Sequence, residues 1–226
     1  MSRYVFPPEP QPVCAVAGSD DLFPVNRIFC VGRNYAAHAA EMGNSVDREA
    51  PFYFTKSSCH VHPSGTTSDF AAGTRDLHHE IELVVAIGAG GHEISQQMAL
   101  SCVFGYGLGL DMTRRDLQAK SKETRRPWDT AKDFERSAIL APLQPGQEVP
   151  RGDISLTVNG QLRQNGAISD MVWSVPELIA HLSTLYTLNA GDLIMTGTPA
   201  GVGPVVRGDH LVGRLPGLPD VEVRFS

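Results

Sequence analysis

The sequence lacks the features of exported, membrane-spanning and nucleic-acid-binding proteins. It has only four cysteines in 226 residues and no Cys-x-x-Cys pair, which argues against a zinc site or a disulfide framework and indicates reduced thiols. No apolar stretch approaches the roughly 18 residues of a membrane span, and the proline-rich N-terminus is unlike a signal peptide. The formal net charge of -6 argues against a nucleic-acid partner, because phosphate binding requires a clustered basic face. We therefore expect a soluble, cytoplasmic protein with a small-molecule substrate and no membrane partner.

Motifs for several common kinds of chemistry are also absent. No Gly-x-Ser-x-Gly segment indicates a serine hydrolase. The glycine-rich segment 197–203 lacks the Lys-Ser/Thr ending of a phosphate-binding loop, and the glycines of segment 105–109 have the wrong spacing for a dinucleotide fingerprint. His79 and Glu80 do not begin a zinc-binding His-Glu-x-x-His motif, because residue 83 is leucine. The sequence therefore argues against a nucleotide cofactor and against catalysis by a nucleophilic serine.

Length and residue pattern predict one strand-rich domain. A chain of this size is long enough to bury a core of its own. Residues 1–24 carry repeated prolines, which block helices and ladder donors, so we expect an extended N-terminal arm followed by a single catalytic domain over 25–226. The fold class is predicted to be α+β, dominated by strands, with few helices. The expected elements are strands at 28–31, 52–56, 154–158 and 193–196, a hairpin turn at Asn159-Gly160, and helices over 35–41 and from Ser174.

Three carboxylates are the most informative feature that is present. Glu80 and Glu82 lie two residues apart in an apolar segment, so a strand would point both to one face. Asp111 ends a second hydrophobic run. If all three meet, each pair of charges at ~4 Å repels by roughly 4 kcal/mol at an effective dielectric near 20, a cost that a divalent cation removes. Hard oxygen ligands favour Mg²⁺ or Mn²⁺ over zinc.

Each of these residues has a structural alternative. Strands with one solvated face often alternate acidic and apolar residues, which would make Glu80 and Glu82 ordinary surface groups. Asp111 could instead cap a helix or a turn. His38 and Glu41 lie three residues apart on a predicted helical turn, so the imidazole and the carboxylate can meet, either as a functional dyad or as a surface pair of little consequence.

Taken together, these segments resemble the fumarylacetoacetate hydrolase superfamily, in particular its short single-domain acylpyruvate hydrolases. The match spans most of the chain, and five ordered motifs make a chance resemblance improbable. The residues that carry it are 31–35 with His38 and Glu41, 80–82, 110–113 with Arg115 and Gln118, Pro127-Trp128 followed by Ala131-Lys132, and 196–203.

The resemblance implies a fumarylacetoacetase-type mixed β-sandwich roll and assigns roles to the carboxylates. Glu80, Glu82 and Asp111 would hold Mg²⁺ or Mn²⁺, and the cation would take the keto oxygen and the carboxylate of a pyruvoyl group. Lys132 matches the catalytic lysine of the family, with a solvated surface amine as the alternative.

Acid-base and substrate-binding roles are implied for further residues. His38 and Glu41 match a dyad on a segment that orders over the substrate, where the imidazole would activate water. Contacts with the substrate are implied for a set of cationic and polar groups, whose alternative is surface ion pairing. This set is Arg33, Lys56, Arg115, Gln118 and the Gly197–Thr198 backbone.

The implied substrate is a 1,3-diketo acid. Fumarylpyruvate from the gentisate route of aromatic catabolism is the most specific expectation, with cleavage of a carbon-carbon bond to give fumarate and pyruvate. Two other outcomes remain open on the same metal site: decarboxylation of oxaloacetate, and isomerisation of an unsaturated diacid. A non-catalytic, metal-dependent binding protein is a further alternative. The resemblance also implies a homodimer.

Overall fold

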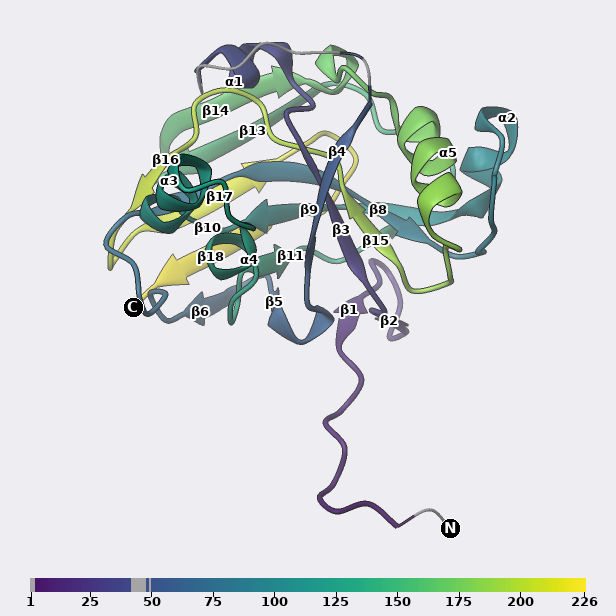
Figure 1. Cartoon of the computed structure of the whole chain (residues 1–226), viewed down its shortest axis with the longest axis horizontal. Coiled ribbons are helices and arrows are strands. Elements are labelled where there is room, and N and C mark those ends of the chain that lie inside the picture. The colour runs from purple at the N-terminus through teal and green to yellow at the C-terminus, as the bar shows by residue number, and fades with distance from the viewer. Residues whose placement is uncertain (1–2, 42–47, 49) are drawn as a thin grey trace.

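The computed structural model describes residues 3–41, 48 and 50–226, and strands dominate its regular structure (Figure 1). A mixed sheet of eight strands forms its centre. Across this sheet the order is β4 (Phe52–Lys56), β3 (Ile28–Gly32), β15 (Leu193–Met195), β8 (Ile81–Ile87), β9 (Val103–Asp111), β11 (Ala138–Leu140) and β5 (Val61–Pro63), with β12 (Gln144–Pro145) beside β9. The pairs β3–β15 and β5–β11 are parallel, and the other pairs of this sheet are antiparallel.

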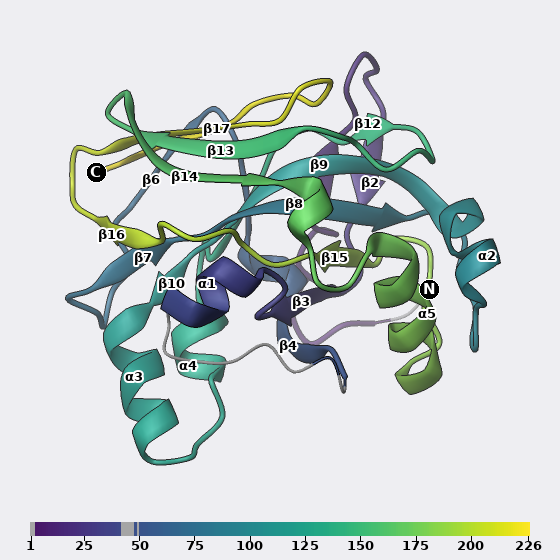
Figure 2. The same ribbon diagram turned by 90° about the horizontal axis from the view of Figure 1, so that it is seen from above.

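Smaller sheets and short helices cover the central sheet. A five-stranded sheet has the order β14 (Gln161–Ala167), β13 (Asp153–Val158), β17 (His210–Arg214), β18 (Val221–Phe225) and β6 (Thr66–Ser68). A three-stranded ribbon contains β10 (Thr113–Arg114), β7 (Leu77–His79) and β16 (Gly203–Val205), and β1 (Val13–Ala15) pairs with β2 (Leu22–Pro24). The α-helices are α1 (Ala36–Glu41), α2 (Gln96–Ala99), α3 (Arg115–Glu123), α4 (Asp129–Lys132) and α5 (Val175–Leu185). In Figure 2, β13, β14 and β17 lie on one side of β8 and β9, and α1, α3 and α4 lie on the other.

The two-residue period of β8 divides the core into two layers. Ile81 and Leu83 belong to the hydrophobic cluster beneath the five-stranded sheet, whereas Val84 and Ala86 belong to a second cluster on the opposite face. All seven residues of β8 are buried. The alternative of a strand with one solvated face is therefore wrong. Glu80 and Glu82 share the face of Val84, which places both carboxylates inside the protein.

Local sequence signals explain the elements that were predicted correctly. Helix α5 begins after Ser174, whose side chain forms a capping box with Glu177. Asn159 and Gly160 both adopt positive φ angles, of 52° and 77°, as a tight two-residue hairpin turn requires. The strand-dominated α+β fold predicted from the sequence is confirmed, and no helix of the described residues is long and apolar enough to cross a membrane.

Two segments differ from the prediction. In Figure 1 residues 3–12 project from the domain as an extended segment, but residues 13–24 form the β1–β2 hairpin. Cys14 and Phe23 of this hairpin are buried in the second hydrophobic cluster. The extended region is thus shorter than the proline spacing suggested. Helix α3 was not predicted, because its residues are mostly polar and its only large apolar residue is Leu117.

Candidate metal centre and active site

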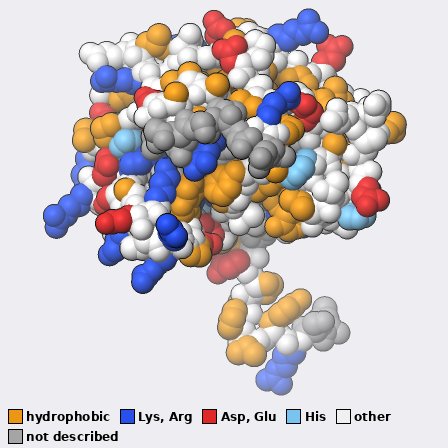
Figure 3. Space-filling view, turned by 45° about the horizontal axis from the view of Figure 1, so that its top comes forward, with side chains coloured by type: hydrophobic (Ala, Val, Ile, Leu, Met, Phe, Trp, Pro, Cys, Tyr) orange, Lys and Arg blue, Asp and Glu red, His pale blue; other side chains and the backbone are white. Residues whose placement is uncertain are grey.

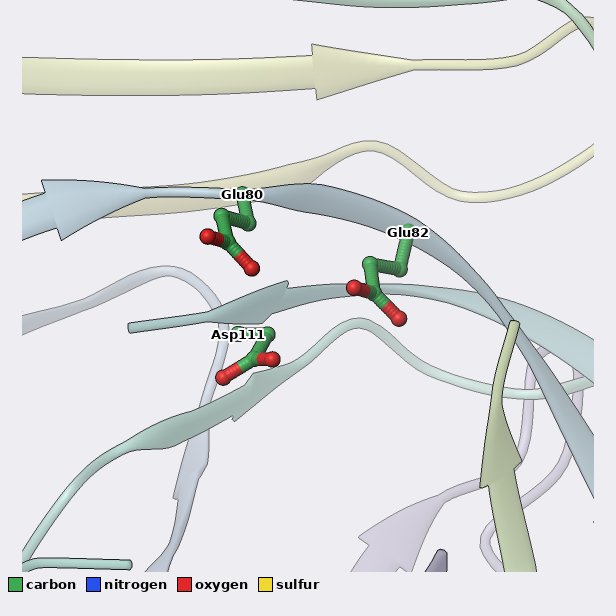
Figure 4. A group of neighbouring side chains, drawn as sticks. All are labelled: Glu80, Glu82 and Asp111. Carbon is green, nitrogen blue, oxygen red and sulfur yellow. The ribbon is translucent and has the colours of Figure 1, made fainter. Parts of the chain in front are cut away.

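The three predicted carboxylates converge at the end of the β8–β9 pair. Glu82 lies on β8, Glu80 directly precedes that strand, and Asp111 ends β9; the Asp111 amide donates to the Glu80 carbonyl at 2.9 Å. One oxygen of each carboxylate lies within 4.8 Å of one oxygen of both others. Figure 4 shows the three groups directed toward one space. Relative exposures of 5%, 1% and 0% for Glu80, Glu82 and Asp111 exclude the surface alternative.

Burial and mutual repulsion set the protonation of this cluster. Burial raises the pKa of Glu82 well above its ordinary value, and the charges of Asp111 and Glu80 raise it further. Burial acts in the same direction on Glu80, but the charges of Lys132 and Arg115 outweigh it and hold the pKa of Glu80 below its ordinary value. The free-energy cost of burial and charge repulsion that no cation offsets therefore falls on Glu82.

Three cationic side chains surround the carboxylates. The ammonium group of Lys132 donates to Glu80, Asp111 and the Thr113 hydroxyl, each at 2.7 Å, which uses all three of its donors. Burial opposes the charge of Lys132, but the carboxylates of Asp111 and Glu80 raise its pKa overall. Lys132 is thus a buried, charged residue, and the alternative of a solvated surface amine is wrong.

Lys56 and Arg115 complete the set of cations. Lys56 lies behind the cluster with its ammonium group 2.9 Å from Asp111 Oδ1, and its side chain is fully buried. The Arg115 guanidinium donates to Glu80 at 2.5 Å and to the Gln118 side-chain carbonyl at 2.6 Å. Three carboxylates are therefore balanced by three fixed positive charges.

The residues present fit a divalent cation. Asp111 Oδ1 is buried and has no hydrogen-bond donor, because the nearby Lys56 ammonium is an ion-pair contact without hydrogen-bond alignment. A buried carboxylate oxygen that lacks a donor is costly unless another positive group binds it. All the candidate ligands are carboxylate oxygens, the donors that Mg²⁺ and Mn²⁺ prefer.

His38 and Glu41 form a pair beside this cluster, and Glu41 also contacts the loop that contains Gly201. His38 Nδ1 lies 3.3 Å from a Glu41 carboxylate oxygen, and the Gly201 amide donates to the same carboxylate at 3.1 Å. His38 is buried and lines the pocket that contains Glu80 and Glu82. The carboxylate thus contacts the Nδ1 side of the ring and leaves Nε2 for other partners.

Comparisons with known proteins identify the family of this chain. Residues 27–226 match the sequence profile described as fumarylacetoacetate (FAA) hydrolase C-terminal. The chain belongs to this family. It is 46% identical to a fumarylpyruvate hydrolase of Ralstonia sp over 80% of this chain and 97% of the relative. It is also 42% identical to an oxaloacetate tautomerase of Escherichia coli, over 84% of this chain and 88% of the relative.

A solved structure of the family is closely similar. It is the crystal structure of fumarylpyruvate hydrolase from Pseudomonas aeruginosa in complex with Mn²⁺ and pyruvate, with 46% sequence identity and a TM-score of 0.95. The alignment covers 99% of this chain and 99% of that chain. The family resemblance and the fold class predicted from the sequence are confirmed.

The predicted substrate-binding residues of this family member occupy different positions around the pocket. Arg33, Arg115, Gln118 and Thr198 line it together with His38, Glu80, Glu82 and Lys132. Lys56 is fully buried behind Asp111. The Gly197 amide donates to Glu82 at 2.8 Å, and so it orients a carboxylate of the cluster.

Gln164 links the segments that carry the site and was not singled out from the sequence. Its side-chain carbonyl accepts a hydrogen bond from the Ile81 amide at 3.1 Å. Its amide group donates to the Thr198 hydroxyl at 2.7 Å and to the Pro199 carbonyl at 2.9 Å. One buried side chain therefore fixes the start of β8 against the loop that follows β15. No sequence pattern marks it, because it is a single glutamine within a strand.

Three further pocket residues were also missed. Phe54, Lys122 and Trp128 line the same pocket as the carboxylates. Trp128 belongs to the Pro-Trp motif, but nothing in the sequence indicates that its ring reaches the pocket. Lys122 lies on α3, the helix that was not predicted.

Proposed function

We propose that this protein is a Mg²⁺- or Mn²⁺-dependent hydrolase that cleaves the carbon-carbon bond of acylpyruvates, with fumarylpyruvate as the preferred substrate. The single observation that carries the proposal is the buried cluster of Glu80, Glu82 and Asp111, whose ligand atoms lie within 4.8 Å of one another. The similarity to two fumarylpyruvate hydrolases supports the choice of substrate. The products would be fumarate and pyruvate.

Glu80, Glu82 and Asp111 would hold the metal. When bound, a divalent cation supplies Lewis-acid polarisation of the keto group of a 2-oxo acid. The Gly197 amide keeps Glu82 directed at the cluster, and Lys56 stabilises the charge of Asp111 from behind. These second contacts hold the ligands in place before the cation arrives.

His38 is the general base of the proposed reaction. Its ring takes a proton from water while the water oxygen adds to the acyl carbonyl carbon. Glu41 orients the ring through Nδ1, and the Gly201 amide holds Glu41 in place. The bond between that carbon and the pyruvoyl methylene then breaks, and its electron pair leaves with pyruvate as the enolate, which takes up a proton.

In the proposed reaction, Lys132 stabilises the oxyanion that develops on the substrate. In the described structure its three donors are used by Glu80, Asp111 and Thr113, so a substrate oxygen would replace one of these acceptors. A preorganised donor to a developing oxyanion is typically worth roughly 3 to 4 kcal/mol of transition-state stabilisation. Gln118 and Arg115, joined by a hydrogen bond, lie at the same wall of the pocket.

The direct test is to mix the protein, Mn²⁺ and fumarylpyruvate, and to follow both enol absorbance and pyruvate. We expect one pyruvate for each substrate consumed, with loss of activity on chelation of the metal. Absence of pyruvate from fumarylpyruvate and from several other acylpyruvates would reject the hydrolase proposal.

A second candidate function is interconversion of the keto and enol forms of oxaloacetate. It is favoured by the 42% identity to an oxaloacetate tautomerase, a similarity close to that of the hydrolase relatives. The same metal site could hold either 2-oxo acid. Oxaloacetate separates the cases: a tautomerase changes the enol absorbance without forming pyruvate or carbon dioxide. Release of carbon dioxide from oxaloacetate would indicate a decarboxylase. A diacid isomerase would instead convert an unsaturated diacid into its isomer without cleavage.

Organisation and location are further proposals: the family resemblance supports a homodimer, and the residue pattern supports one domain and a cytoplasmic location. We propose a single catalytic domain over 25–226, a homodimer and a cytoplasmic location. Sedimentation of the full chain tests the dimer, and a monomer at micromolar concentration would reject it.

A further inference from the structure

One face of α3 lines the active-site pocket along its whole length. Arg115, Gln118 and Lys122 are spaced at i, i+3 and i+7, so they project from the same side of the helix. All three line the pocket. Lys120 and Glu123, between and after them, are exposed. Arg115 donates to Glu80 of the carboxylate cluster and to Gln118. Lys122 lies one turn farther along the helix.

Within the described ranges 3–41, 48 and 50–226, Lys122 and Arg33 are the pocket cations that pair with no carboxylate. Arg115 is paired with Glu80, and Lys132 is paired with Glu80 and Asp111. Among the residues that the structure describes, no carboxylate lies within ion-pair distance of Lys122 or Arg33. Burial lowers the pKa of Lys122, and the nearby charges of Arg115 and Arg33 lower it further. An anion at this point would relieve the repulsion among the three cations.

Aromatic rings connect Lys122 to the carboxylate cluster. The Lys132 ammonium lies 4.9 Å from the centre of the Phe54 ring, and the Phe54 and Trp128 ring centres are 6.2 Å apart. The Lys122 ammonium in turn lies 5.2 Å from the centre of the Trp128 ring. A flat, unsaturated acyl chain can pack against such rings. Figure 3 shows basic side chains gathered on the left of this face of the molecule.

Charge at the inner end of the pocket points to a substrate with two negative groups. Three carboxylates and three fixed cations cancel, so the metal-loaded cluster carries the charge of the cation. The carboxylate of a pyruvoyl group neutralises only part of that charge. Lys122 and Arg33 add two further positive charges to the lining of the pocket.

We infer that Lys122, with Arg33 beside it and Trp128 beneath it, forms a subsite for a carboxylate at the far end of the acyl group. Lys122 is the specificity-determining residue: it selects acylpyruvates whose acyl chain ends in a carboxylate over those whose chain ends in a methyl group. This inference rests on the proposed hydrolase function and deepens it. Fumarylpyruvate has the required terminal carboxylate, whereas acetylpyruvate does not.

The test compares the two substrates in wild-type protein and in Lys122→Gln, with Lys120→Gln as the matched control on the exposed side of α3. Loss of one charge-assisted hydrogen bond to a carboxylate weakens recognition roughly tenfold to a hundredfold. We expect kcat/KM of Lys122→Gln to fall by that factor for fumarylpyruvate, mainly through KM, and to change by less than about threefold for acetylpyruvate. Lys122→Arg should keep most of the preference, and Lys120→Gln should match wild type.

Equal effects of Lys122→Gln on both substrates, or none on either, would overturn the inference. If Lys122 merely packs on Trp128, Lys122→Gln lowers thermal stability and leaves the ratio of the two kcat/KM values unchanged, which also overturns it.

A binding measurement keeps the inference separate from the hydrolase proposal. Calorimetric titration of the Mn²⁺-loaded protein with fumarate and with crotonate, in the presence of pyruvate, compares two ligands that differ in one carboxylate. We expect fumarate to bind more tightly, and Lys122→Gln to remove that advantage. If wild-type protein hydrolyses neither acylpyruvate but retains this Lys122-dependent preference, the hydrolase proposal fails and the subsite stands. If fumarate and crotonate bind alike, the subsite fails whatever the enzyme hydrolyses.

Discussion

Lys56 lies directly behind Asp111, with its ammonium group 2.9 Å from Oδ1 and with no exposed side-chain surface on either residue. Lys56 does not line the pocket that contains Glu80 and Glu82, so its charge acts on Asp111 from outside that pocket. A lysine predicted from the sequence to contact substrate thus lies where its charge acts on a candidate metal ligand instead.

Lys56→Met should destabilise the metal-free protein by roughly 3 kcal/mol, because the buried Asp111 carboxylate loses one of its two ammonium partners and keeps only Lys132. At about 2–4 °C per kcal/mol for a chain of this size, the midpoint of thermal unfolding falls by roughly 10 °C. Saturating Mn²⁺ should restore part of the loss, since the cation supplies positive charge to Asp111. Lys120→Met is the control, and an unfolding temperature equal to that of the control would contradict the role assigned to Lys56.

Lys132→Met should separate metal binding from turnover. The variant removes a cation that contacts two of the three candidate ligands, so Mn²⁺ should bind at least as tightly as in wild type. Turnover should fall by roughly two to three orders of magnitude, as for loss of one oxyanion donor. Mn²⁺ titration and pyruvate release measure the two effects, and wild-type turnover would remove Lys132 from the mechanism.

Metal affinity should rise with pH because Glu82 must lose its proton to bind a cation. The pKa of Glu82 is raised in the metal-free protein, by burial first and then by Asp111 and Glu80. Below that raised pKa, the dissociation constant should increase about tenfold for each pH unit, and above it the constant should level off. Calorimetry in buffers of different ionisation enthalpy should detect proton release on Mn²⁺ binding. No proton release at any pH below the plateau would contradict this assignment.

The contribution of Glu82 to the stability of the metal-free fold should change with pH in the opposite sense to metal affinity. A carboxyl group whose pKa is higher in the folded state than in the unfolded state stabilises the fold below its unfolded pKa. That contribution is lost as the pH rises through the folded pKa. Mn²⁺ should suppress this loss.

Gly197→Ala should damage the site more than an equally strained glycine elsewhere. Gly197 has a φ of +97°, and an added Cβ would lie 2.8 Å from the Asn34 Cβ. Gly208 has a similar φ of +92° but no atom within 4 Å of an added Cβ, so Gly208→Ala measures backbone strain alone, about 1–3 kcal/mol. We expect Gly197→Ala to lose more unfolding free energy and also Mn²⁺ affinity, because the Gly197 amide orients Glu82. Equal losses in the two variants would show that crowding at Gly197 is unimportant.

The sequence predicts the elements whose signals are local. The strand over residues 52–56, the Asn159-Gly160 turn and the capping box at Ser174 depend on neighbouring residues, and the structure has all three. The spacing of Glu80 and Glu82 predicts that they share a face, because the strand period is two residues.

The rest of the site depends on tertiary contacts. Burial on both faces of β8 results from packing against segments far away in the sequence, such as β13 and the β1–β2 hairpin. Lys132 is buried because it meets carboxylates that lie 21 and 52 residues away. Helix α3 packs against α4, β7 and β10, which lie elsewhere in the sequence, and Leu117 alone does not mark it as a helix.

The most direct test of the central claim is a titration of the metal-free protein with Mn²⁺, followed by the paramagnetic resonance signal of the free ion. We expect wild-type protein to remove one Mn²⁺ per chain from solution, and Glu82→Gln to remove none while remaining folded. A free-ion signal in wild-type protein that equals the signal of buffer alone would contradict the claim.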